Sequence, residues 1–171
     1  FSKVTGVLAL HGLDVLDAAA HTNEQGIALE VFTVERSAAP IIVWERARAD
    51  VEAVLAGRLA LSARLAERAE RYATPWARPS PLLREPGVTF DNDASAGATV
   101  MEVHCSDGIG VLYRITRAIS ELDLDIRSAK VQTLGDEVVD AFYLRDSGRA
   151  KILDADHLQE IERAILQAVR Q

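Results

Sequence analysis

The sequence predicts an α+β protein made of two copies of one small unit, each an antiparallel sheet with its helices on one face. The first observation is an internal repeat: residues 1–8 (FSKVTGVL) return about 111 positions later as residues 112–119 (LYRITRAI). The second is that alternating and helical hydrophobic periods follow one another along each copy. The period is far longer than the roughly 20 to 50 residues of a solenoid repeat. Each copy is therefore expected to be a whole small domain.

The second copy is expected to open with a strand at residues 99–105, where apolar residues alternate with Glu102 and His104. A turn is expected at residues 106–110, because Ser, Asp and two Gly residues cluster there. Apolar residues then recur at helical spacing over residues 112–122, which predicts a helix with one buried face.

Two more strands and a closing helix complete this copy. Residues 125–133 alternate again, residues 134–137 fit a hairpin turn, and residues 138–144 form a third strand. A helix over residues 158–169 should follow an aspartate cap. The order β-α-β-β-α is the split βαβ of the ferredoxin-like plan, a short antiparallel sheet with both helices on one face.

The third strand, at residues 138–144, is apolar on both faces apart from Asp140. A sheet with one wet face should instead alternate polar and apolar residues. Two explanations are open. Phe142 is tucked under a loop, or the open sheet face or strand edge is covered by a partner domain. The second explanation is favoured because it accounts for the whole strand.

The first copy begins on its helix, at residues 1–8, and continues through strands near residues 13–22 and 27–35. Two helical stretches, at residues 44–55 and 61–72, extend it beyond the second copy. Its opening strand and turn are expected to precede residue 1, so the chain is expected to be part of a longer polypeptide.

A proline-rich segment separates the two copies, because four of the five prolines lie at positions 75, 79, 81 and 86. Proline cannot continue a helix and favours extended backbone. We therefore expect a first domain at residues 1–74, a linker with a short strand at residues 75–91, and a second domain at residues 92–171. The short strand, residues 88–91, could close the first sheet or begin the second domain.

Composition excludes several classes of function. The net charge is −7, and an acidic chain without a basic stripe is a poor match for nucleic acid. The sequence contains no run of about 18 apolar residues, so it predicts no membrane span. A single cysteine, Cys105, allows no internal disulfide, which fits a reducing, cytoplasmic location.

The turn and strands of the second copy resemble a known family. Residues 106–112 (SDGIGVL) resemble the Asp-Arg-Pro-Gly-Leu-Leu turn of ACT domains, which are small amino-acid-sensing modules appended to metabolic enzymes. The resemblance continues through Asp125-Ile126 and Val139-Asp140. It implies two ferredoxin-like (βαββαβ) ACT domains, the first without its opening strand. The family's Arg-Pro is Gly108-Ile109 here, so no ligand contact by an arginine side chain carries over.

A closer resemblance covers nearly the whole chain. Residues 88–92 (VTFDN), 99–103 (TVMEV) and 138–143 (VVDAFY) are similar to the C-terminal tandem ACT region of bifunctional PII uridylyltransferase/uridylyl-removing enzymes. That resemblance implies sensing of glutamine and a PII signalling protein as the partner of the longer enzyme, in nitrogen control. It also implies Mg²⁺ and UTP as cofactor and substrate of catalytic domains that lie outside this sequence.

The chain itself is not expected to be catalytic. A nucleotidyltransferase needs a Gly-Ser-type turn and paired aspartates that hold Mg²⁺ on a triphosphate, and neither is present. The four histidines, at positions 11, 21, 104 and 157, are scattered rather than gathered as in a metal phosphohydrolase. No cofactor, metal site or catalytic residue is therefore predicted within these residues.

The predicted ligand site is the turn at residues 106–110, which opens a helix. Free N–H groups and the positive dipole end of a helix suit the carboxylate of an amino acid. Asp107 is the acid nearest to the ammonium, although it could serve only as the helix cap. The hypothesis is that glutamine or another small amino acid binds where this turn meets a strand of the neighbouring unit. The predicted contacts are Asp107, Gly108, Ile109, Gly110, Val111, Leu112, Ile126, Arg127 and Ser128.

Two other interpretations remain open from the sequence. The chain could be an ACT regulatory region of another amino-acid biosynthetic enzyme. It could also be a dimerisation module that binds no ligand, in which only ACT–ACT pairing within or between chains survives.

Overall fold

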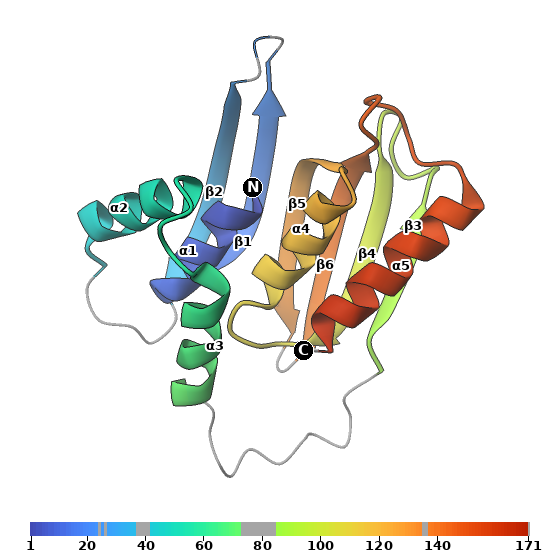
Figure 1. Cartoon of the computed structure of the whole chain (residues 1–171). Helices are drawn as coiled ribbons and strands as arrows, with labels where there is room; N and C mark the ends of the chain where they lie inside the picture. The colour runs from blue at the N-terminus through green and yellow to red at the C-terminus, as the bar shows by residue number, and fades with distance from the viewer. Residues whose placement is uncertain (24, 26, 37–41, 73–84, 135–136, 171) are drawn as a thin grey trace.

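The computed structural model describes residues 1–171 except 24, 26, 37–41, 73–84, 135–136 and 171. The core of the predicted proline-rich linker and the tip of the predicted hairpin therefore lie outside the described residues. The remaining chain is an α+β structure, in which α1, α4 and α5 lie on one face of an antiparallel sheet (Figure 1). Within the described residues, no helix has the length and apolarity that a membrane crossing requires.

The second copy has the element order that the sequence predicts. The strands are β4 (Thr99–Ser106), β5 (Asp125–Leu134) and β6 (Glu137–Arg145), and the helices are α4 (Val111–Glu121) and α5 (Ala155–Val169). Asp154 caps α5, where its Oδ1 accepts a hydrogen bond from the backbone N–H of His157 at 2.7 Å.

The first copy also follows its prediction. It contains α1 (Ser2–Leu10), β1 (Leu13–Thr22) and β2 (Ala28–Arg36), followed by α2 (Trp44–Leu55) and α3 (Leu61–Tyr72). The break between the two long helices falls at Gly57, whose φ of +68° is a left-handed conformation that glycine adopts readily.

The two copies share one sheet instead of having a sheet each. Its strand order is β2-β1-β5-β6-β4-β3, and every neighbouring pair is antiparallel. The sequence left open where residues 88–91 belong. The structure places them in β3 (Gly87–Asp91), which pairs with β4, so that Val88 lies opposite Val103 at the edge of the second copy.

The copies are related by a pseudo-two-fold axis. Ala18 of β1 pairs with Ala129 of β5, and these residues are 111 positions apart, as are the equivalent residues of the repeat. The hydroxyl groups of Thr5 on α1 and Thr116 on α4, also 111 apart, lie 3.2 Å from each other. Equivalent residues therefore meet across the interface, as in a symmetric dimer.

The main core lies between the sheet and the helices. Phe142 is fully buried there on the helix-facing side of β6, so it is not tucked under a loop. The strand edge of the second copy is covered by the first copy, through the pairing of β1 with β5. Along β6, the residues that alternate with Phe142 on the helix-facing side are apolar except for Asp140.

Candidate functional site

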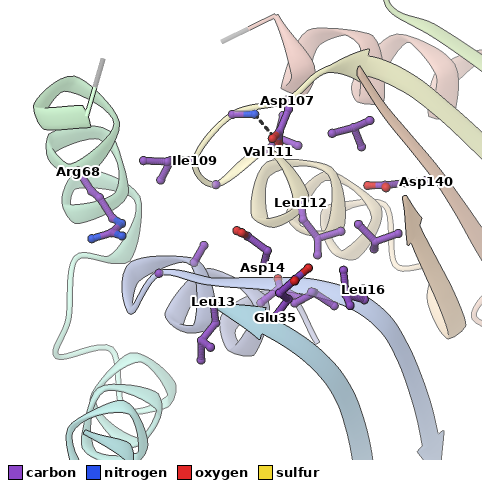
Figure 2. A pocket seen from close by; sticks show the side chains of 18 of the residues that line it. Leu13, Asp14, Leu16, Glu35, Arg68, Asp107, Ile109, Val111, Leu112 and Asp140 are labelled. Atoms are coloured by element: carbon purple, nitrogen blue, oxygen red, sulfur yellow. Dashed lines mark hydrogen bonds between the residues drawn. The ribbon is translucent and has the colours of Figure 1, made fainter. Parts of the chain in front are cut away.

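A pocket of about 530 Å³ lies between the two copies, and we call it the inter-copy pocket (Figure 2). The turn before α4 forms one side of it. The start of β1, with Glu35 of β2, forms another, and α3 adds two side chains. Its lining residues are Thr5, Ala9, Gly12, Leu13, Asp14, Val15, Leu16, Glu35, Arg68, Tyr72, Asp107, Gly108, Ile109, Gly110, Val111, Leu112, Val131, Val138 and Asp140.

The turn before α4 is shaped by glycine. Gly110 is the N-cap residue of α4 and has a φ of +79°, and no side chain accepts a cap hydrogen bond from this helix. Asp107 is therefore not the helix cap, which corrects one of the two interpretations of that residue. Its Oδ1 instead accepts a hydrogen bond from the backbone N–H of Gly108 at 2.8 Å. Arg114 supports the turn by donating to the carbonyl oxygen of Ile109 at 3.3 Å.

All six predicted residues of the turn line the inter-copy pocket, from Asp107 to Leu112. The other three, Ile126, Arg127 and Ser128, do not line it. Arg127 lies instead within 3.8 Å of Asp125 and 3.3 Å of His21.

The pseudo-two-fold axis explains why a different strand faces the turn. The turn of the second copy meets the strand that crosses the axis from the first copy, which is β1 at residues 13–16. Residues 124–127, at the start of β5, are the repeat equivalents of that stretch, so they occupy the symmetry-related position. The strand that faces the turn comes from the neighbouring unit, and it is β1 instead of the predicted stretch at residues 126–128.

Asp140 is a site residue that the sequence analysis did not select. Its side chain is fully buried, and in the described part of the chain neither carboxyl oxygen has a hydrogen-bond partner. Burial raises the pKa of this carboxyl to about 7; the nearby backbone N–H of Gln132 opposes the rise without meeting hydrogen-bond geometry, and Asp107 adds to it. The signal in the sequence was a lone acid within the apolar run at residues 138–144.

Arg68 is the second residue that the sequence did not assign to the site. It projects from α3 toward the turn beside Ile109 (Figure 2). Its guanidinium carbon lies 4.7 Å from the centre of the Tyr72 ring, and its Nε is buried with no hydrogen-bond partner among the described residues. Helical spacing from Leu61 and Leu65 places Arg68 on the inner side of α3, which was the available signal.

The charges around the pocket favour a ligand that carries a cation. In the part of the chain that the structure describes, the carboxyl groups of Asp14, Glu35, Asp107 and Asp140 line it, and Arg68 is the lining arginine. Within the same residues, no group of three His, Cys, Asp or Glu side chains is placed to hold a metal ion. Cys105 lies behind the pocket, where burial first and then Asp140 raise the pKa of its thiol to about 11.

Comparisons with known proteins agree with this architecture. Residues 87–171, from β3 to the end of the chain, match the family model described as an ACR9-like, ACT-like domain. No solved structure matches the chain.

The whole chain is similar to curated bifunctional uridylyltransferase/uridylyl-removing enzymes. It is 37% identical to the enzyme from Rhodospirillum rubrum over 175 residues, which cover 100% of this chain and 18% of that protein. It is 35% identical to the enzyme from Azospirillum brasilense over 174 residues, which cover 99% of this chain and 18% of that protein. The chain thus spans about a fifth of the length of these relatives. Residues 87–171 therefore belong to the ACT-like domain family, and the whole chain is similar along its length to the bifunctional uridylyltransferase/uridylyl-removing enzymes.

Proposed function

We propose that this chain is an allosteric regulatory module that binds a small amino acid, glutamine in the first instance, in the inter-copy pocket. One observation carries the proposal. Among the described residues, the buried side-chain atoms without hydrogen-bond partners belong to Arg68 and Asp140, and both residues line this pocket. Buried polar groups are nearly always paired, so two unpaired groups in one pocket point to a ligand that completes them.

An amino acid carries the two charged groups that the unpaired side chains of the pocket require. Its α-carboxylate matches the Arg68 guanidinium and the positive end of α4 in the turn that lines the pocket. The N–H of Val111 is already used, since it donates to the carbonyl oxygen of Gly108 at 3.0 Å, so the N–H groups that follow it in the first turn are the candidates. The ammonium group of the amino acid matches the acids that line the pocket. A cavity of about 530 Å³ lies within the usual size range of small-molecule sites. Few contacts are required, because a millimolar dissociation constant corresponds to only about −4 kcal/mol.

The position of the pocket supports a regulatory role. Its lining comes from both copies, so a bound ligand contacts α3 and β1 of one copy and the α4 turn of the other. A ligand that binds one arrangement of the copies better than another shifts the equilibrium between them. A coupling free energy of about 1 to 3 kcal/mol is typical of allosteric control.

The rest of the proposal concerns the longer enzyme of which this chain would be a part. We propose that the module acts in the cytoplasm on uridylyltransferase and uridylyl-removing domains that use UTP and Mg²⁺ on a PII signalling protein. The names and whole-chain similarity of the relatives support this assignment. The same fold could also serve another amino-acid biosynthetic enzyme, and a panel of amino acids tests that alternative.

Calorimetry with the 171-residue chain tests the binding step. L-Glutamine should bind with a dissociation constant in the millimolar range. The variant Arg68→Gln should weaken binding by about tenfold to a hundredfold, because a hydrogen bond to a charged group contributes about 1.5 to 3 kcal/mol. The matched control is Arg163→Gln, since the Arg163 side chain is 69% exposed on α5 and forms an ion pair with Glu160, away from the pocket lining. If no amino acid in the panel gives heat at several millimolar, the proposal fails.

A module that only pairs with other copies is the second candidate. It is favoured by the outer strand β2, where Ile27 precedes the strand and is 63% exposed, Leu29 is 65% exposed and Val31 is 59% exposed. Such a strand edge can pair with another chain. Light scattering and thermal unfolding, each with and without L-glutamine, separate the candidates. Pairing alone predicts a dimer whose mass and melting temperature do not change when the amino acid is added.

A further inference from the structure

We propose that Asp140 is the counter-charge for a ligand ammonium group, so that the inter-copy pocket selects ligands with a free primary amine. The inference rests on the proposed function, because it names how an amino acid would be recognised at that site. It assigns a specificity role to a residue that the family resemblance includes but to which it gives no ligand contact.

Asp140 has no hydrogen-bond partner for its carboxyl group among the described residues. It lies in β6 opposite Val103 of β4 and Val131 of β5, and its carboxyl group points toward the start of α4 (Figure 2). An isolated carboxylate in such a place is strongly destabilising unless it is paired or neutralised. No described residue donates a hydrogen bond to either of its oxygens, although it lines the pocket. A cation that enters the pocket can supply the missing partner.

The first copy has an acid at the equivalent strand position. Glu30 of β2 is the repeat equivalent of Asp140, since it pairs with Ala20 as Asp140 pairs with Val131. Asp140 lines the inter-copy pocket, whereas Glu30 does not. The acid of the second copy is therefore the one of this pair that a ligand in the pocket can reach.

The groups that face Asp140 make its protonation sensitive to a ligand. Burial, opposed by the backbone N–H of Gln132 on β5 and assisted by Asp107 in the turn, raises the pKa of Asp140 to about 7. Cys105 faces it from β4 as a neutral thiol, since the pKa of that thiol is raised to about 11. The other titratable groups around the pocket are Asp14, Glu35, Arg68 and Tyr72. An ammonium beside Asp140 favours the ionised form, lowers the pKa of Asp140 and releases its proton to solvent.

Proton release on binding is therefore the measurement. L-Glutamine is titrated into the 171-residue chain in buffers of different ionisation enthalpy at pH 6, 7 and 8. With a pKa near 7 for the free site, we expect release of about 0.9 proton at pH 6, about 0.5 at pH 7 and about 0.1 at pH 8. The affinity should rise by about tenfold from pH 6 to pH 8, because less Asp140 then needs to lose its proton.

A modified ligand and two protein variants test whether the ligand amine interacts with Asp140. N-Acetyl-L-glutamine has no ammonium and should bind at least about tenfold more weakly than L-glutamine. The variant Asp140→Asn should lose the preference for the amine, the proton release and the pH dependence together. Glu30→Gln is the matched control, because it removes the equivalent acid outside the pocket and should keep all three properties. Circular dichroism at each pH confirms that both variants are folded.

The outcomes separate this inference from the proposed function. If L-glutamine or another amino acid binds without proton release, and acetylation has no effect, the role of Asp140 is overturned while the binding function stands. If ethylammonium binds with proton release but no amino acid binds, Asp140 keeps its role and the amino-acid function is overturned. If neither probe binds, both proposals are overturned.

Discussion

At the scale of the residue, Asp140 gives the molecule an unusual dependence on pH. Most acids are stabilised in their ionised form by folding, but Asp140 is fully buried and has no donor among the described residues. Its pKa is raised from 3.8 to about 7, chiefly by burial. Between these two values the folded chain holds more protons than the unfolded chain. The free energy of unfolding therefore falls as pH rises from about 4 to about 7.

Replacing Asp140 by asparagine should remove this fall. A shift of about 3 pKa units corresponds to at most about 4 kcal/mol, and relaxation around the ionised group reduces it. We expect Asp140→Asn to be more stable than the natural chain at pH 8, by on the order of 1 to 3 kcal/mol, with a smaller difference at pH 5. Urea unfolding across this range measures the effect. Glu102→Gln, an exposed acid on β4, is the control, and parallel profiles for Asp140→Asn and the natural chain would contradict the prediction.

At the scale of the element, α1 depends on a close contact at Gly6. A Cβ atom at this position would lie 2.7 Å from Leu61 Cδ2 and 2.7 Å from Tyr113 Cδ2. The helix therefore approaches α3 and α4 more closely than an alanine would allow. Val7 beside it is fully buried in a second, smaller core, which is separate from the main core and includes Leu61 and Tyr113.

Gly6→Ala tests this contact against helix propensity. Alanine favours a helix by about 1 kcal/mol over glycine, so propensity alone predicts a gain in stability. We expect a loss of about 1 to 3 kcal/mol, because the added methyl group overpacks the crossing of the helices. Thermal unfolding measures the change. Gly108→Ala serves as the comparison, since a Cβ there meets nothing within 4 Å; equal effects of the two substitutions would exclude the packing explanation.

The elements themselves were largely predictable, whereas their assembly was not. Alternation and helical spacing identified β4, α4 and β5, because each shows a regular pattern of apolar residues, and β6 stood out as a short apolar run after a turn. The pairing of β1 with β5 left no comparable pattern, since the residues at the junction, such as Ala18 and Ala129, are small. Asp140 and Arg68 stood out only as charges on inner faces, and their meeting in one pocket depends on how the two copies pack.

At the scale of the whole molecule, the duplicated chain folds like a symmetric dimer. Thr5 and Thr116 meet on the axis, and each hydroxyl also bonds a carbonyl of its own helix, Ser2 O at 2.8 Å and Leu112 O at 2.7 Å. Both threonines are buried, with 2% and 0% of their surface exposed. The contact therefore couples the two copies through groups that are otherwise satisfied locally.

A double-mutant cycle at this pair measures the coupling. Thr5→Val and Thr116→Val should each lower the free energy of unfolding by about 1 kcal/mol, because one polar group then faces a methyl group. The double variant should lose less than the sum of the two, by about 0.5 kcal/mol or more, since two apolar groups then pack together and no hydroxyl faces a methyl group. Chemical unfolding gives all three values. Strict additivity would mean that the hydroxyl groups do not interact across the axis.

The pairing of equivalent positions also has an evolutionary consequence. In a dimer of identical chains, any substitution changes both halves of the interface at once. Here the two halves are encoded separately, so Glu30 and Asp140 can differ although they occupy equivalent strand positions. One copy can then keep its acid away from the pocket, while the other places its acid in the pocket lining. Duplication within one gene thus allows the two sides of a symmetric scaffold to be selected for different tasks.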